Sequence, residues 1–361
     1  MHKFLFFPHV PYHVTTFISV INELNSCDVS IVYADHLKHY GSKKTKESII
    51  KKMADEKNIR AIPYTPQLLW KEKPDVLVVM NDWGGWPKRA VEDAKNMRIL
   101  TVGHMEGPED YYDTHLDDGY PGKKRSLYKK VDYVFLLGKY DEQYYKNLKT
   151  VLIGSPRFDN FFNYSINRSK SKEKLVGINC NFSYGLYADV ANRWIDDVIS
   201  VVKSKYFNYQ ISQHIGDNTN LKGLNVYTGS LYELIEESTV FISRFSTAII
   251  ESLLMGIPVI YYNPHKEDQD TYFNPMGAFP KPTNKKELGD AIDDILGNKS
   301  KWLAGAENFL DLHVANRDGK SGKIFAKELI EIAKKKGTLD PYFPIRSHIK
   351  YIIESITQKF K

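Results

Sequence analysis

Short apolar runs alternate with amphipathic stretches along most of this 361-residue chain. The runs are bounded by turn residues, as in buried strands, and the stretches between them have helical spacing. Strands that alternate with helices predict an α/β protein with mostly parallel sheets. The expected strands are Lys3–Phe7, Val29–Ala34, Asp75–Met80, Arg98–Val102, Tyr133–Leu137, Val151–Ile153, Leu175–Asn179, Tyr209–Gln213, Asn225–Tyr227, Val240–Ile242 and a last one starting at Pro258.

The alternation pauses at a polar and basic segment, residues 163–174, which has no apolar period and is the best candidate for a linker. We therefore expect a first Rossmann-like domain over residues 1–160 and a second over 175–335. A tail over 336–361 alternates apolar and basic residues. It could touch a membrane surface, but packing back on the first domain is favoured. Ligands of such domains bind at the carboxyl ends of the strands, so we expect the functional residues in the loops that follow the strands.

Composition narrows the class of protein. Hydrophobic residues make up 42% and charged residues 26%, which is ordinary for a globular chain, and a net charge of +6 is too small to argue for nucleic acid. The two cysteines, Cys27 and Cys180, lie far apart and predict reduced thiols in the cytoplasm. The sequence contains no run of eighteen apolar residues, so a membrane-spanning helix is not expected. The apolar run near residue 1 is too short for a signal peptide, so export is not expected either.

The most informative segment is residues 240–263, where an apolar strand, a short loop, a helix and a second strand follow one another. Ser246 is expected to cap the helix and Gly256 to end it. The loop hydroxyls and backbone N–H groups predict a phosphate site. Glu251 lies one helical turn after Thr247, where its carboxylate could accept both hydroxyls of a ribose. A capped strand–helix unit without a ligand is the alternative interpretation.

Other candidates also follow strand ends. Glu106, held by the turn Gly107-Pro108, could act as a general base, and Asp82 could bind substrate hydroxyls or orient a histidine. His214 could donate to a phosphate or transfer a proton, as could His13 in the first strand–helix loop. Arg157 could pair with a phosphate or be held structurally by Asp159. For each of them a purely structural role is the alternative.

Several common signatures are absent from the sequence. There is no GxxxxGK[ST] or GxGxxG loop, no HExxH and no CxxC. No Asp-x-Asp follows a strand, as it would at a metal-bound diphosphate. We therefore expect no bound metal and no cofactor, with any phosphate held by backbone, hydroxyl and basic groups.

The order of these motifs resembles the GT-B glycosyltransferase superfamily, nearest to the CDP-glycerol glycerophosphotransferases and capsule polysaccharide transferases. Residues 154–159, GSPRFD, resemble the family's G-x-P-R-N-D motif, and residues 318–323 loosely resemble its D-G-x-A-S-x-R element. A strand ending in a histidine and the segment SRFSTAIIES complete the likeness. Two departures stand out: His214 is followed by Ile215 rather than proline, and the W-H-G-T motif is replaced by residues 103–107, GHMEG. That segment looks more like the H-x-E-A-G of UDP-N-acetylglucosamine 2-epimerases.

The resemblance implies a GT-B fold, with two Rossmann-like domains facing across a cleft, and a metal-independent transferase of surface-polysaccharide assembly. Its donor would be a sugar or polyol linked to CMP, CDP or UDP, and its acceptor a glycan or a lipid-linked molecule. Phosphate would be contacted by Ser243, Ser246 and Thr247, with Arg157 and His214 near the leaving phosphate and Glu251 on the ribose. Glu106, Asp82 or His13 would be the base. A UDP-sugar 2-epimerase or hydrolysing epimerase is the alternative. The oligomeric state stays open, and peripheral contact with the inner membrane face is expected.

Overall fold

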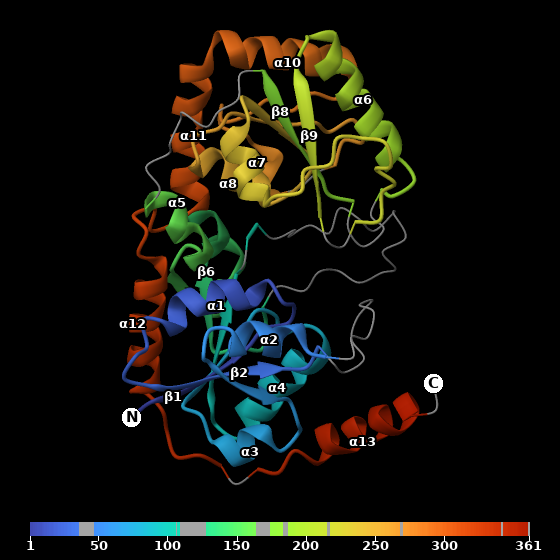
Figure 1. Ribbon diagram of the computed structural model, residues 1–361. Coiled ribbons are helices and arrows are strands. Elements are labelled where there is room, and N and C mark those ends of the chain that lie inside the picture. Colours follow the sequence, from blue (N-terminus) through green and yellow to red (C-terminus); the bar gives the residue numbers. More distant parts are fainter. Residues whose placement is uncertain are drawn as a thin grey trace. The chain divides into compact units, whose positions relative to one another are not determined.

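The computed structural model describes residues 1–35, 47–105, 107–108, 128–163, 174–182, 187–214, 217–267, 270–340 and 342–359. The chain divides into two compact units. Unit 1 comprises Met1–Gly107, Ser126–Phe162 and Val314–Lys361, and unit 2 comprises Pro108–Arg125 and Asn163–His313. Each unit is an α/β body with its own sheet (Figure 1).

Unit 1 is built on a parallel sheet with the strand order β3-β2-β1-β4-β5-β6-β7. The order reverses between β1 and β4, so this edge is the switch point at which ligands of doubly wound folds bind. Phe4 of β1 stands between Val29 of β2 and Val76 of β4. The strands are β1 Lys3–Phe7, β2 Asp28–Tyr33, β3 Arg60–Pro63, β4 Val76–Val79, β5 Leu100–His104, β6 Tyr133–Leu136 and β7 Lys149–Leu152.

Helices pack on this sheet because they bury apolar stripes against it. Phe17 lies 5.0 Å from Phe6 between ring centroids, and Phe325 lies 4.7 Å from Phe135; all four side chains are fully buried. Burial of such rings is worth roughly 2–3 kcal/mol each. The helices are α1 His13–Ile21, α2 Ile49–Asp55, α3 Leu68–Glu72, α4 Gly85–Asn96, α5 Asp159–Asn163, α12 Ser321–Ala333 and α13 Ile345–Lys359, with short 3-10 turns η1 Lys139–Tyr144 and η2 Pro156–Phe158.

The chain returns to unit 1 earlier than the sequence predicted. We expected the second domain to run to residue 335, but the return begins at Val314, and α12 lies against α1 in unit 1. Phe325 and Leu329 of α12 are fully buried in that core. The helical period predicts that α12 has a buried face, but it does not say which sheet covers that face. The tail is also part of unit 1, through α13.

Unit 2 has a four-stranded parallel sheet with the order β11-β10-β8-β9. Trp194 fills its core and donates a hydrogen bond of 3.0 Å to the carbonyl of Tyr262. The predicted strand Asn225–Tyr227 is reduced to a single bridge between Ile211 and Val226. The elements are β8 Leu175–Cys180, α6 Ala191–Ser204, β9 Asn208–Gln213, α7 Leu231–Glu237, β10 Val240–Ser243, α8 Ala248–Leu254, β11 Val259–Tyr261, α9 Asp270–Phe273, α10 Lys285–Gly297 and α11 Lys299–His313.

Candidate functional site

The loops that follow β8 and β10 are tied to each other at the carboxyl edge of the unit 2 sheet. The two strands are neighbours and parallel, so their ends meet at one edge. Asn179 Nδ2 donates to Ser243 Oγ at 3.0 Å, and Asn181 Nδ2 donates to the Phe245 carbonyl at 3.1 Å. Because these bonds join two loops, the backbone around Ser246 is held in place before any ligand binds.

Arg244 and Glu267 form a buried ion pair beneath the same loops. Arg244 Nε donates to Glu267 Oε1 at 2.6 Å, and their side chains are 2% and 0% exposed. The guanidinium also donates to the Asn181 carbonyl at 2.9 Å and stacks on the rings of Phe182 and Tyr187. This pair was not predicted from the sequence. An arginine at the end of an apolar strand was the available signal, because a buried arginine requires a partner.

The predicted phosphate-binding hydroxyls fall into two groups. Ser246 and Thr247 are partly exposed at the start of α8. Ser246 Oγ accepts the Ala248 N–H at 3.2 Å, and its carbonyl accepts the Tyr272 hydroxyl at 2.8 Å. Thr247 rather than Ser246 occupies the N-cap position, so the predicted cap is wrong by one residue, although the Ser246 hydroxyl still makes a capping bond. Gly256 follows the helix at φ +68°, as predicted.

Ser243 does not present its hydroxyl to a ligand in this structure. Its side chain is fully buried. The hydroxyl donates to the Arg244 carbonyl at 2.5 Å and accepts the bond from Asn179. Ser243 therefore fixes the loop from inside, which differs from the predicted phosphate contact, because sequence alone does not show on which side of a strand end a hydroxyl lies.

Glu251 is placed as predicted, one helical turn below the exposed hydroxyls. It is 3% exposed, and the Tyr232 hydroxyl of α7 donates to its Oε1 at 3.2 Å. A buried carboxylate is stable only when its oxygens accept hydrogen bonds. The position therefore suits recognition of a group that offers paired hydroxyls.

A third buried carboxylate, Asp217, organises the loop after β9. Its Oδ2 accepts the Phe182 N–H at 2.7 Å and the Cys180 thiol at 3.1 Å, and its Oδ1 accepts the Thr219 N–H at 2.8 Å. Burial, followed by the adjacent Asp217 carboxylate, raises the pKa of the Cys180 thiol above its usual value, so the thiol stays a donor. The half-buried His214 lies at this edge, and its backbone N–H donates to the Cys180 carbonyl at 3.0 Å.

His13 and Arg157, two of the other candidates, belong to unit 1. His13 opens α1 after β1, is 4% exposed, and accepts the His9 N–H on Nδ1 at 3.1 Å. With Nδ1 accepting, the neutral ring carries its proton on Nε2, which suits a hydrogen-bond donor better than the predicted base. Arg157 lies in η2, half-buried, with its guanidinium 5.3 Å from the Phe158 ring.

Asp82 has a structural role that differs from the predicted catalytic one. It is 1% exposed, and its Oδ2 accepts three backbone N–H groups, from Lys129 at 2.9 Å, Lys130 at 2.5 Å and Val131 at 3.1 Å. Burial raises the pKa of Asp82, while the three bonds oppose this rise. Asp82 thus anchors the segment that leads into β6. Glu106 lies outside the described residues.

Within the part of the chain that the structure describes, no cluster of three or more His, Cys, Asp or Glu side chains could hold a metal ion. Within the same part, no helix combines the length and the apolar character that crossing a bilayer requires.

Two parallel sheets, the first with a switch point and the second with loops tied at its carboxyl edge, define an α/β protein of two Rossmann-like units. Solved structures share this fold. A variant of the wall teichoic acid polymerase TagF soaked with CDPG has a TM-score of 0.60 and 10% identity, over 92% of this chain and 89% of that chain. UDP-GlcNAc 2-epimerase from Neisseria meningitidis bound to UDP-GlcNAc has a TM-score of 0.59 and 13% identity, over 92% and 100%.

Sequence comparison points to the same class. No family model matches the chain. Curated relatives from Lactococcus lactis are named UDP-N-acetylglucosamine--N-acetylmuramyl-(pentapeptide) pyrophosphoryl-undecaprenol N-acetylglucosamine transferase. The protein of subspecies cremoris strain MG1363 is 28% identical over 253 residues, which is 64% of this chain and 67% of the relative. The protein of subspecies lactis strain IL1403 is 27% identical over 269 residues. The names of these relatives and the shared fold agree with the predicted resemblance to the GT-B glycosyltransferase superfamily and with the predicted fold class.

Proposed function

We propose that this protein transfers a sugar from a nucleoside diphosphate donor to a glycan or lipid-linked acceptor in the assembly of a cell-surface polysaccharide. The names of the sequence relatives support a transferase, and they favour UDP-N-acetylglucosamine as the first donor to test. The observation that carries the proposal is the arrangement of Ser246, Thr247 and Glu251 at the tied edge of unit 2.

In this proposal the donor diphosphate binds at the hydroxyls of the partly exposed Ser246 and Thr247. The loop that carries them is fixed by Asn181 and Tyr272. Fixed donors stabilise the negative charge that develops on a departing phosphate, since they need not reorganise during the reaction. His214, at the same edge of unit 2, is the candidate for a further contact to that phosphate.

The Glu251 carboxylate accepts hydrogen bonds from the two ribose hydroxyls. Bonds to a charged acceptor are stronger than neutral ones, so this contact would contribute much of the donor's affinity. Tyr232 holds Oε1 from the side of α7 and thereby limits the rotamers that Glu251 can adopt. No metal is required, because hydroxyls and backbone groups serve the phosphates.

The test is a thermal-shift panel of CMP, CDP, UMP, UDP and GDP with wild type, Glu251→Gln and the control Asp290→Asn, which removes an exposed carboxylate from the same unit. A ligand at a hundredfold excess over its Kd stabilises the folded state by about 2.7 kcal/mol. We expect UDP to shift wild type and Asp290→Asn alike and Glu251→Gln much less. A panel without any shift would contradict the proposal, and unchanged activity in EDTA would support the absence of a metal.

The epimerase is the alternative that the structural neighbours keep open. Such an enzyme needs carboxylates around the sugar, and the candidates in the sequence are Asp82, Glu106 and Asp110. Asp82 is now engaged with three backbone N–H groups, and the other two lie outside the described residues. Turnover of UDP-N-acetylglucosamine without any acceptor would favour the epimerase over the transferase.

A further inference from the structure

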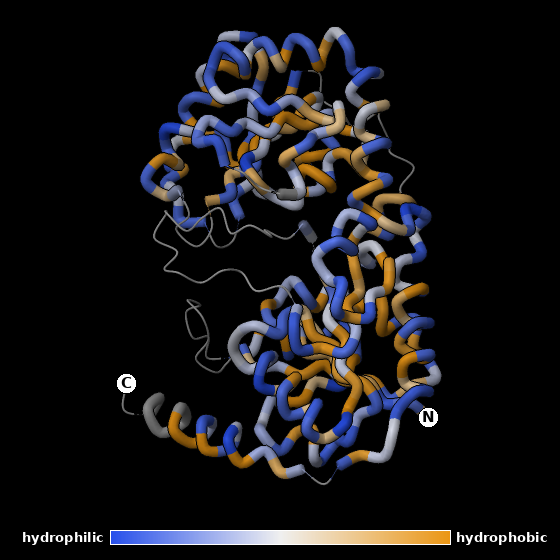
Figure 2. The backbone as a smooth tube through the Cα atoms, turned by 180° about the vertical axis from the view of Figure 1, so that it is seen from behind, coloured by the Kyte–Doolittle hydropathy of each residue, from blue (hydrophilic) through white to orange (hydrophobic). Residues whose placement is uncertain are grey.

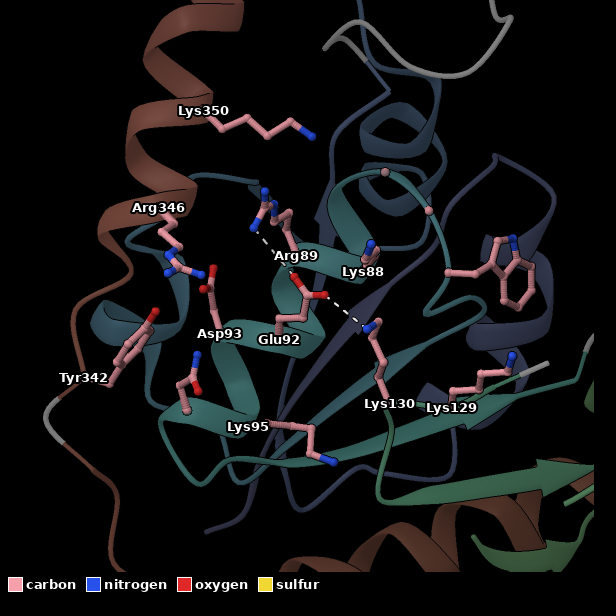
Figure 3. A pocket seen from close by; sticks show the side chains of 14 residues that line it. Lys88, Arg89, Glu92, Asp93, Lys95, Lys129, Lys130, Tyr342, Arg346 and Lys350 are labelled. Atoms are coloured by element: carbon pink, nitrogen blue, oxygen red, sulfur yellow. Dashed lines mark ion pairs between the residues drawn. The ribbon is translucent and has the colours of Figure 1, made fainter. Parts of the chain in front are cut away.

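Unit 1 contains a basic pocket of about 1140 Å³ that none of the chemistry above uses. It lies along α4 and is closed on one side by α13 (Figure 3). Seven cationic side chains line it, against the two carboxylates Glu92 and Asp93. The cations are Lys88, Arg89, Lys95, Lys129, Lys130, Arg346 and Lys350.

The carboxylates do not balance this charge. Glu92 is shared between Arg89 Nη1 at 3.6 Å and Lys130 Nζ at 3.3 Å. Asp93 is 5% exposed and has Ser347 of α13 beside it, so it lies at the bottom of the pocket rather than at its rim. The pocket therefore presents an excess of positive charge to whatever approaches it.

Helix α13 is fixed to unit 1 through one of its faces. Ser347 is 1% exposed, the Tyr351 ring lies 5.8 Å from the Trp86 ring, and Gln67 Nε2 is 2.7 Å from His348 Nδ1. These contacts set the rotation of the helix about its own axis. They also place Arg346 and Lys350 in the pocket lining.

The opposite side of α13 is apolar and faces outward. Ile345, Ile349 and Ile352 are 61%, 53% and 43% exposed. Their spacing of four and then three residues puts them on one helical face. The tube coloured by hydropathy shows apolar and polar positions alternating along this helix (Figure 2). A single exposed isoleucine is ordinary, but a stripe of three beside a basic pocket is the pattern of an interaction surface.

We propose that these three isoleucines and the pocket cations, together the α13 surface, dock the protein on an anionic lipid bilayer. An amphipathic helix at a membrane lies with its apolar face in the acyl boundary and its basic residues at the headgroups. Anionic headgroups supply the charge that the pocket lacks. A soluble polyanion would meet the cations but leave the isoleucines in water, so a bilayer accounts for both features. The proposal does not depend on the donor site.

The test is co-sedimentation of the full chain with vesicles of phosphatidylglycerol mixed with phosphatidylcholine, compared with phosphatidylcholine alone. We expect preferential binding to the anionic vesicles, and this binding should weaken with added salt. Replacing the three isoleucines with serine should lower the binding constant roughly tenfold or more. Lys88→Gln with Lys129→Gln should lower it about fivefold for each charge removed, from a contribution of about 1 kcal/mol each.

Matched controls lie in unit 2. Phe273→Ser removes an exposed apolar side chain and Lys299→Gln an exposed charge, and both should bind vesicles as wild type does. Circular dichroism of each variant, compared with wild type, shows that the fold is kept. Equal binding by wild type and the isoleucine variant would overturn the proposal, as would binding to inorganic polyphosphate without binding to vesicles.

Discussion

The Asp159 carboxylate accepts the backbone N–H of Gly322 at 2.7 Å, and it also accepts the N–H of Ser321 at 2.9 Å. Asp159 ends the GSPRFD segment, and Gly322 lies in the segment that resembled a second family motif. The two motifs therefore meet in unit 1, where the carboxylate caps the first turn of α12. Asp159 was a candidate for holding Arg157 in place. In the structure its two carboxylate oxygens instead accept the N–H groups at the start of α12. These two bonds join the start of α12 to the start of α5, in addition to the apolar contacts that hold α12 in the unit 1 core.

Asp159→Ala should weaken that attachment. The variant leaves two N–H groups at the start of α12 without their acceptor, which costs about 1–3 kcal/mol. Urea unfolding measures the loss, and hydrogen exchange should show faster exchange in α12. Asp318→Ala is the control, because its bonds to the ammonium and the backbone N–H of Lys320 are exposed and contribute little. Equal losses in the two variants would contradict a capping role.

Gly154→Ala should be far more harmful than Gly223→Ala. Both glycines have positive φ, +78° and +82°, which costs an alanine roughly 1–2 kcal/mol. At Gly154 the new Cβ would lie 2.2 Å from the Ala315 carbonyl oxygen, whereas nothing lies within 4 Å at Gly223. Unfolding free energies of the two variants separate the steric clash from the backbone cost. If the two variants lose the same free energy of unfolding, the close approach of Ala315 does not explain the need for a glycine at position 154.

The Arg244–Glu267 pair predicts a strong non-additivity. Glu267→Ala leaves a buried guanidinium without its carboxylate, which costs about 3–5 kcal/mol. Arg244→Met with Glu267→Ala removes both charges, so we expect the double variant to be more stable than Glu267→Ala alone. Urea unfolding of both single variants and the double variant completes the cycle. Simple addition of the two single losses would mean that the pair is not coupled.

Asp93 predicts a pH dependence of stability. Its burial raises the pKa to about 6, above the 3.8 of an ordinary aspartate, while the Ser347 hydroxyl opposes the rise. Between these two values the folded carboxyl keeps a proton that the unfolded chain has released, so the free energy of unfolding falls as pH rises through this window. Asp93→Asn removes this dependence.

Relative to wild type, Asp93→Asn should therefore gain on the order of 2 kcal/mol between about pH 4 and pH 7. Chemical unfolding across this range measures the change, with the exposed Asp290→Asn as the control variant. Parallel pH curves for wild type and Asp93→Asn would refute the assignment. Because Asp93 lies beneath α13, the protection of α13 amides, that is, their exchange relative to the intrinsic rate at each pH, should also fall with pH in wild type and stay constant in Asp93→Asn.

Local pattern predicted most elements because each one depends on the residues inside it. β1 is Lys3–Phe7 as predicted, and β10 is Val240–Ser243, one residue longer than the apolar run indicated. β3, over Arg60–Pro63, was missed, since its half-exposed edge position gives no apolar run. The position of Glu251 one turn into α8 could be predicted, because it is a matter of helical spacing from Thr247. Asp217 and the Arg244–Glu267 pair were not found, because their partners come from other loops.

The sequence by itself determined the parallel α/β class, the motif order and the position of Glu251 relative to the loop hydroxyls, because these follow from periodicity and spacing along one segment. Only the tertiary structure decided which hydroxyls are exposed, that Asp82 anchors a backbone turn, that α12 belongs to unit 1, and that one face of α13 is covered while its isoleucines are not. Each of these depends on contacts between residues far apart in the chain, and periodicity within one segment does not encode them.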